Sequence, residues 1–144
     1  MDDATKNEIK ALRANAKIAC VASVDGRGYP QVKAMLVLEH ERLAQQYLST
    51  NLSSRRAKQF LENPEAAVYY CEEASFKGAL FTGEMRVRDD REARELLWRD
   101  GFEMYYPKGV TDEDYVVLEF TPETVNYYHG LHNETVPMAE LENR

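Results

Sequence analysis

A predicted β-hairpin near the start of the chain constrains its fold more than any other feature. The run Ile18–Val24 is apolar, Asp25-Gly26-Arg27-Gly28 is a turn signal, and residues 31–39 alternate. One face of the second run carries Lys33, Met35 and Val37, so the lysine has apolar neighbours and a partner other than bulk water is expected. The opposite face carries Val32, Ala34, Leu36 and Leu38.

Further strands and helices are expected on either side of this hairpin. Strands are expected at 45–50, 66–71, 79–88, 116–120 and 124–128, and helices at 3–16, at 53–62 and after Asp89-Asp90. Several strands follow one another with only a turn between them, which favours an antiparallel barrel over a doubly wound parallel sheet. The predicted fold is mainly β with helices: an antiparallel barrel of six or seven strands with covering helices.

Length and composition predict one domain. With 144 residues the chain can bury its own core, and we expect a single domain over 1–144, with a core at about 16–130 and a C-terminal arm at 131–144. A formal net charge of −7 argues against nucleic acid or an anionic membrane as a partner. Cys20 and Cys71 lie in strand-like runs and are expected to be reduced and buried. With an acidic amino terminus and no apolar run of membrane-spanning length, a cytoplasmic protein is predicted.

The segment 47–64 carries the chemistry that points to a ligand. A strand ends in Thr50-Asn51, and Ser53-Ser54-Arg55-Arg56 then opens a helix that Asn63-Pro64 ends, with Asn63 suited to a left-handed cap. Hydroxyl groups, free backbone N–H groups and guanidinium charge at one helix N-terminus favour a phosphate. The alternative is an ordinary capped helix with solvated arginines, because serines are common caps.

Taken in order, these segments resemble the FMN-binding split-barrel family typified by pyridoxamine 5′-phosphate oxidase, in its smaller general-stress-protein branch. The resemblance covers about residues 16–130. Its most specific part is the Thr-Asn-x-x-Ser-x-basic segment between a strand and a helix ended by Asn-Pro. The matching segments are Asp25-Gly26-x-Gly28-x-Pro30, Val32-Lys33-Ala34-Met35, Ser49-Thr50-Asn51-x-x-Ser54-Arg55-Arg56, Asn63-Pro64, Thr82-Gly83-Glu84-Met85, Leu97-Trp98 and Val116-x-Leu118-Glu119.

The resemblance implies a homodimer of split β-barrels with two FMN molecules at the interface. It places Lys33, Ser54 and Arg56 around the FMN phosphate, and backbone groups of the second hairpin strand against the flavin ring. The expected cofactor-binding residues are Lys33, Ala34, Met35, Leu36, Thr50, Asn51, Ser54, Arg55 and Arg56.

The chain departs from the larger pyridoxamine phosphate oxidases, whose C-terminal Trp and Arg help to hold substrate. Here that end is Tyr127-Tyr128-His129-Gly130, and a polar side chain that would contact the flavin near Gly78 is missing. No catalytic residue or substrate is therefore assigned. The leading hypothesis is an FMN-dependent oxidoreductase of a small molecule, with a nicotinamide cofactor as candidate reductant. The alternatives are a non-catalytic flavin storage, carrier or stress-sensing protein, and a deazaflavin in place of FMN.

Two other groups of residues are candidates for a functional role. The aromatic run that contains Trp98, Phe102, Tyr105 and Tyr106 either packs in a core or dimer interface, or covers a flavin or substrate. The segment His129-x-x-His132 has no third ligand at a useful spacing, so no metal site is predicted.

Overall fold

The computed structural model describes residues 1–38 and 42–142 and shows a mainly β fold with helices. Two short 3₁₀ turns lie at Phe102–Met104 and Gly109–Thr111. The helices are α1 (Asp3–Asn15), α2 (Arg55–Glu62), α3 (Arg91–Leu97) and α4 (Met138–Leu141). The strands are β1 (Ile18–Val24), β2 (Pro30–Leu36), β3 (Gln46–Asn51), β4 (Glu65–Glu72), β5 (Lys77–Arg88), β6 (Tyr115–His129) and β7 (His132–Pro137).

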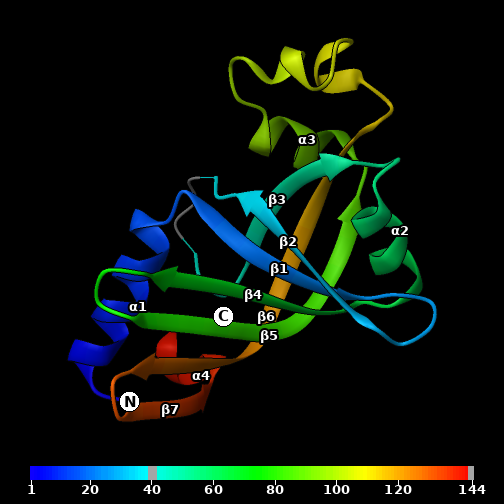
Figure 1. The fold of residues 1–144 in the computed structure, drawn as a ribbon. Coiled ribbons are helices and arrows are strands. Elements are labelled where there is room, and N and C mark those ends of the chain that lie inside the picture. Colours follow the sequence, from blue (N-terminus) through cyan, green and yellow to red (C-terminus); the bar gives the residue numbers. More distant parts are fainter. Residues whose placement is uncertain (39–41, 143–144) are drawn as a thin grey trace.

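One seven-stranded sheet organises the chain, in the order β2-β1-β4-β5-β6-β3, with β7 on the far part of β6. Every pairing is antiparallel. The sheet curls so that β3 and β2 come near each other without pairing, which leaves the barrel split there (Figure 1). The predicted fold class is confirmed, and its strand number takes the upper of the two expected values.

The predicted hairpin is confirmed as β1 and β2, whose register runs from Ile18 opposite Leu36 to Val24 opposite Pro30. The last expected residue of the second strand, residue 39, lies outside the described residues. Met35 is 7% exposed and faces the interior, and it is the one buried residue of β2.

The largest difference from the predicted strands is β6. Its residues 116–120 and 124–128 were expected as two strands, but one continuous strand of 15 residues runs through both. The long strand β5 pairs with β6 along its whole length, and the register shifts between Thr82 and Gly83 because β6 carries one extra residue, Glu123, as a bulge. The gap at residues 121–123 between the two expected strands therefore contains a bulge rather than a loop.

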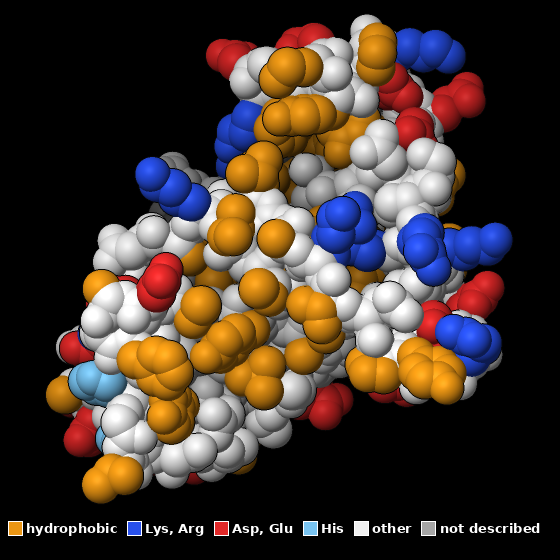
Figure 2. All heavy atoms as spheres, in the orientation of Figure 1, with side chains coloured by type: hydrophobic (Ala, Val, Ile, Leu, Met, Phe, Trp, Pro, Cys, Tyr) orange, Lys and Arg blue, Asp and Glu red, His pale blue; other side chains and the backbone are white. Residues whose placement is uncertain are grey.

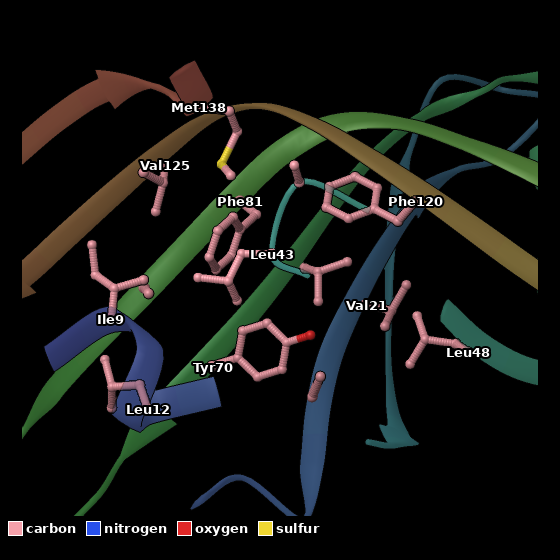
Figure 3. Packing of buried hydrophobic residues seen from close by; sticks show 14 of the residues in the cluster. Ile9, Leu12, Val21, Leu43, Leu48, Tyr70, Phe81, Phe120, Val125 and Met138 are labelled. Carbon is pink, nitrogen blue, oxygen red and sulfur yellow. The ribbon is translucent and has the colours of Figure 1, made fainter. Parts of the chain in front are cut away.

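The core fills the inside of the curled sheet. Side chains from all seven strands and from α1, α2 and α4 meet there, with Tyr70, Phe81 and Phe120 at its centre (Figure 3). Helix α1 closes one end by burying Ile9 and Leu12. Because this core is continuous, it holds the two halves of the split barrel in one arrangement.

The segment 131–144, expected as an arm, lies against this same domain as far as residue 142. Strand β7 pairs with β6, and α4 buries Met138 and Leu141 in the core. No helix in the described part of the chain is both long and apolar enough to span a bilayer.

Two local predictions fail for identifiable reasons. Asn63 was expected in the left-handed region, but it is extended, with φ −138° and ψ 110°. The following Pro64 excludes the helical region for its predecessor and favours this extended backbone. Cys71 is exposed rather than buried, because its place on β4 puts it on the outer face of the sheet with Tyr69. Both cysteines are free thiols.

Gly83 is expected to tolerate no side chain. A Cβ built there would lie 2.2 Å from the carbonyl oxygen of Thr121 and 2.7 Å from Pro122 Cα, and both are backbone atoms. We predict that Gly83→Ala lowers the free energy of unfolding by about 1–3 kcal/mol, as overpacking does elsewhere. Urea unfolding measures this loss. Gly26→Ala is the matched control, because its Cβ would meet only Glu62 Oε2 at 3.6 Å. Equal stability of both variants would contradict the packing described here.

Candidate functional site

A cavity of about 150 Å³ lies where α2 crosses the β1–β2 hairpin. Its charged lining side chains are Lys33, Arg55 and Arg56, which come from two separate segments of the chain. The space-filling view shows Lys and Arg side chains gathered beside α2 (Figure 2). The remaining lining residues are Ser23, Gln31, Val32 and Gln59. Three cations and no carboxylate make this cavity suited to an anion.

A second, more open hollow of about 510 Å³ lies on the other side of α2. It is lined by Glu84, Arg86 and Glu119 among apolar residues such as Leu61. Two carboxylates against one guanidinium make it unfavourable for a phosphate. The smaller cavity is therefore the better candidate for a phosphate site, because of the charge of its lining and in spite of its smaller volume.

The start of α2 is built as a capped N-terminus next to this cavity. Ser54 is the N-cap, and its Oγ accepts a hydrogen bond of 3.1 Å from the backbone N–H of Ala57. Thr50 at the end of β3 donates to Ser54 Oγ over 3.2 Å. Arg56 Nη2 in turn donates to Thr50 Oγ1 over 3.4 Å. These contacts fix the first turn of α2 to the end of β3.

Arg56 retains an unused donor inside this arrangement. Among the described residues its Nε is buried and has no hydrogen-bond partner. Burial also lowers the pKa of Arg56, because a desolvated guanidinium is less stable as a cation. A bound anion would both accept from Nε and offset this cost, so an anionic ligand explains the unused donor better than a solvated arginine does.

Asn51, predicted near the cofactor, is engaged within the protein. Its Nδ2 donates to Asp114 over 2.7 Å. The backbone N–H and the hydroxyl of Ser53 donate to the same carboxylate over 2.8 and 3.0 Å. These hydrogen bonds lower the pKa of Asp114 and keep it an anion. The 51–53 loop is thus held by a carboxylate of the chain itself.

Strand β2 offers free backbone groups beside the cavity. The hydrogen bonds Val37 N to Lys17 O and Asp25 N to Tyr29 O bracket the β1–β2 pairing. In an antiparallel pair such bonds recur at every second residue, so the backbone groups of Ala34 and Leu36 point to the unpaired edge. Those of Met35 point to β1. Of the three residues expected against the flavin ring, two therefore present N–H and C=O groups that have no partner within the described part of the chain.

The aromatic segment between α3 and β6 reaches the site through Tyr106. Its ring is 4% exposed and packs on Tyr115 with centroids 4.7 Å apart. Burial raises the pKa of Tyr106, while a hydrogen bond with the Ser49 side chain and the charge of Arg56 oppose that rise. Tyr106 therefore lies close enough to Arg56 to interact with it. Tyr106 was a candidate from the sequence, but no sequence pattern predicted its interaction with Arg56.

The other members of this aromatic cluster pack against one another. Trp98 contacts Phe102 and Tyr115 with ring centroids 5.6 and 5.4 Å apart, which favours the packing alternative for Trp98 and Phe102. Tyr105 is 52% exposed and so remains available for an intermolecular contact.

Four lining residues of the cavity were not predicted as site residues: Ser23, Gln31, Val32 and Gln59. Ser23 stands where the inward alternation Ala19, Val21 calls for another apolar residue, and this was the only sequence signal. A metal site is absent from the described part of the chain, where no three His, Cys, Asp or Glu side chains come together.

Comparisons with known proteins identify relatives that share this fold. A protein from Clostridium acetobutylicum related to general stress protein 26, of the pyridoxinephosphate oxidase family, is 37% identical, with TM-score 0.89 over 99% of this chain and 100% of that chain. General stress protein 26 from Bacillus anthracis is 17% identical, with TM-score 0.76 over 92% and 97%. A heme binding protein from Mycobacterium smegmatis is 13% identical, with TM-score 0.75 over 98% and 60%. The last two show a shared fold alone.

No match was found among curated proteins. The profile of the pyridoxamine 5′-phosphate oxidase family, in contrast, matches residues 5–129, which include every residue of the cation-lined cavity. By this match and by the 37% identical relative, the chain belongs to the pyridoxamine 5′-phosphate oxidase family.

Proposed function

We propose that the chain binds FMN and acts as a flavin-dependent oxidoreductase on a small substrate. The observation that carries this proposal is the cavity lined by Lys33, Arg55 and Arg56, in which Arg56 Nε is buried and unpaired among the described residues. The protein has a net charge of −7, so it attracts no polyanion broadly. A local cluster of three cations instead suits one small dianionic group, such as the phosphate of FMN.

The residues fit FMN as follows. Lys33, Arg55 and Arg56 would hold the phosphate, while Thr50 and Ser54 keep the first turn of α2 in place. The free edge of β2, with the backbone groups of Ala34 and Leu36, would accept and donate hydrogen bonds along the ring. When bound, FMN supplies hydride-transfer chemistry, and the residues of the chain bind and orient it.

The functional unit that we propose is a homodimer. The outer face of β2, β1, β4 and β5 is a continuous apolar surface (Figure 2). Ile18 and Leu36 form a cross-strand pair on it, and they are 56% and 55% exposed; Val32 is 68% exposed. An exposed apolar sheet face of this kind marks an interaction site. The face continues to the free edge of β2, so a second copy seated on it would also enclose the flavin.

A non-catalytic flavin carrier or stress sensor is the second candidate. The observation in its favour is that the described lining of the cavity contains no carboxylate, histidine or thiol that could act as a general acid or base. A carrier needs only the binding groups. Hydride transfer to or from a flavin does not require a general acid or base either. The same cavity lining is therefore compatible with both candidate functions.

Isolation of the bound cofactor tests the proposal. The purified protein is expected to be yellow and to release FMN on denaturation, identified by chromatography and mass. A released deazaflavin would change the identity of the cofactor. A released heme would contradict the proposal; this outcome is included because one protein of the same fold is named a heme binding protein. Anaerobic addition of NADH or NADPH then separates the two candidates, because bleaching of the flavin at a useful rate supports an enzyme and its absence supports a carrier.

Tyr106→Phe is expected to weaken FMN binding several-fold. The change removes only the hydroxyl that hydrogen-bonds with the Ser49 side chain beside Arg56 and leaves the aromatic packing in place. A neutral hydrogen bond of this kind contributes about 0.5–1.5 kcal/mol. Flavin fluorescence titration measures the effect. Tyr105→Phe is the control, since that residue is exposed. Unchanged affinity in Tyr106→Phe would show that its hydroxyl does not support the site.

A further inference from the structure

Two neutral polar side chains, Ser23 and Gln59, are the most buried residues in the lining of the cation-lined cavity. Ser23 is 3% exposed and Gln59 is 9% exposed, whereas Lys33 and Arg55 are exposed at the same cavity. Polar groups buried this deeply cost free energy unless they are paired. Ser23 Oγ donates to Gln59 Oε1 over 2.5 Å, and this bond joins β1 to α2.

That bond sets the orientation of the Gln59 amide, because its oxygen faces Ser23 and its nitrogen faces away from Ser23. With Oε1 engaged by Ser23, the amide nitrogen retains two N–H donors; they have no acceptor among residues 1–38 and 42–142, and the nitrogen is not fully buried, so it is open to a ligand or to solvent. Arg56 lies three residues earlier on α2, so both side chains project from the same side of the helix and line the same cavity. Arg56 Nε is a second donor without a partner in the described chain, and this one is buried. Unused N–H donors thus converge from one helix face.

We propose that Gln59, oriented by Ser23, is a phosphate-specificity residue that donates from its amide nitrogen to the phosphate of the bound flavin nucleotide. This inference rests on the proposed function. A glutamine supplies donors without a charge of its own, whereas a glutamate of the same shape would present a carboxylate to a dianion.

Substitutions at this pair separate a ligand contact from a packing role. Gln59→Glu keeps the shape and is expected to weaken FMN binding on the order of 100-fold, and Gln59→Met, which lacks the donors, by about 10-fold. Riboflavin, which has no phosphate, is expected to bind all variants within about 3-fold of the unmodified chain. Ser23→Ala frees the amide to rotate and is expected to give a smaller, FMN-selective loss.

Leu61→Glu is the matched control, because it adds the same charge to α2 at a residue that is 64% exposed and outside the cavity. It should leave the affinity for both flavins unchanged. An equal loss for FMN and riboflavin in the Gln59 variants would overturn the inference and assign Gln59 to packing alone. FMN affinity that is unchanged in Gln59→Glu would also overturn it. If the unmodified chain binds riboflavin as tightly as FMN, or binds neither, the proposed function itself fails first.

Discussion

Arg56→Ala is expected to weaken FMN binding about 100-fold while riboflavin binding changes little. Arg56 lines the cavity, is fixed through Thr50, and carries a buried Nε without a partner in the described chain. A hydrogen bond between charged groups contributes about 1.5–3 kcal/mol, and loss of one or more such bonds to a phosphate accounts for this factor. Equilibrium titration of flavin fluorescence with both ligands measures the two affinities.

Lys58→Ala is the control for charge alone, because Lys58 is an exposed cation of α2 that does not line the cavity. It is expected to change FMN affinity by less than about 3-fold, as a solvent-screened charge does. Arg56→Lys should recover part of the affinity, since a lysine keeps the charge but loses the paired geometry of the guanidinium. Equal weakening of FMN and riboflavin in Arg56→Ala would mean that Arg56 does not meet the phosphate.

Leu36→Asp is expected to convert the proposed homodimer into monomers. Leu36 is 55% exposed on the apolar outer face of the sheet and faces solvent in the single chain, so the substitution should not disturb the core. Within a dimer interface the same carboxylate would be buried without a partner, which costs several kcal/mol. Light scattering coupled to size-exclusion chromatography reports the mass of the assembly.

Leu131→Asp is the matched control, because Leu131 is fully exposed in the turn between β6 and β7 and lies off that face. It should leave the dimer intact. If Leu36→Asp remains dimeric, or if the unmodified chain is a monomer at micromolar concentration, this face is not the interface. Because flavin is proposed to lie beside the same β2 edge, the monomeric variant should also lose FMN affinity.

Local patterns in the sequence predicted most of the fold. Alternation from residue 31 onward located β2, and the segment Ser53-Ser54-Arg55-Arg56 located the start of α2 to within two residues. Such features depend on neighbours a few residues apart, which a sequence displays directly. The bulge that keeps β6 continuous cannot be predicted from such neighbours, because it depends on the pairing of β6 with β5.

The cation-lined cavity was predicted only in part, for the same reason. Lys33 and the two arginines could be grouped through chemistry and family resemblance. Gln59 could not be joined to Ser23, which lies 36 residues away, nor Asn51 to Asp114, which lies 63 residues away. Each of these side chains has an unremarkable residue type, and only the packing of α2 on β1, or of β3 on β6, brings the partners together.

A crystal structure of the protein with FMN tests the central claim most directly. The phosphate is expected in the cavity between α2 and the hairpin, within hydrogen-bond distance of Lys33 and Arg56, with the ring along the free edge of β2. A flavin phosphate bound elsewhere, for example in the hollow beside Glu84 and Glu119, would contradict it.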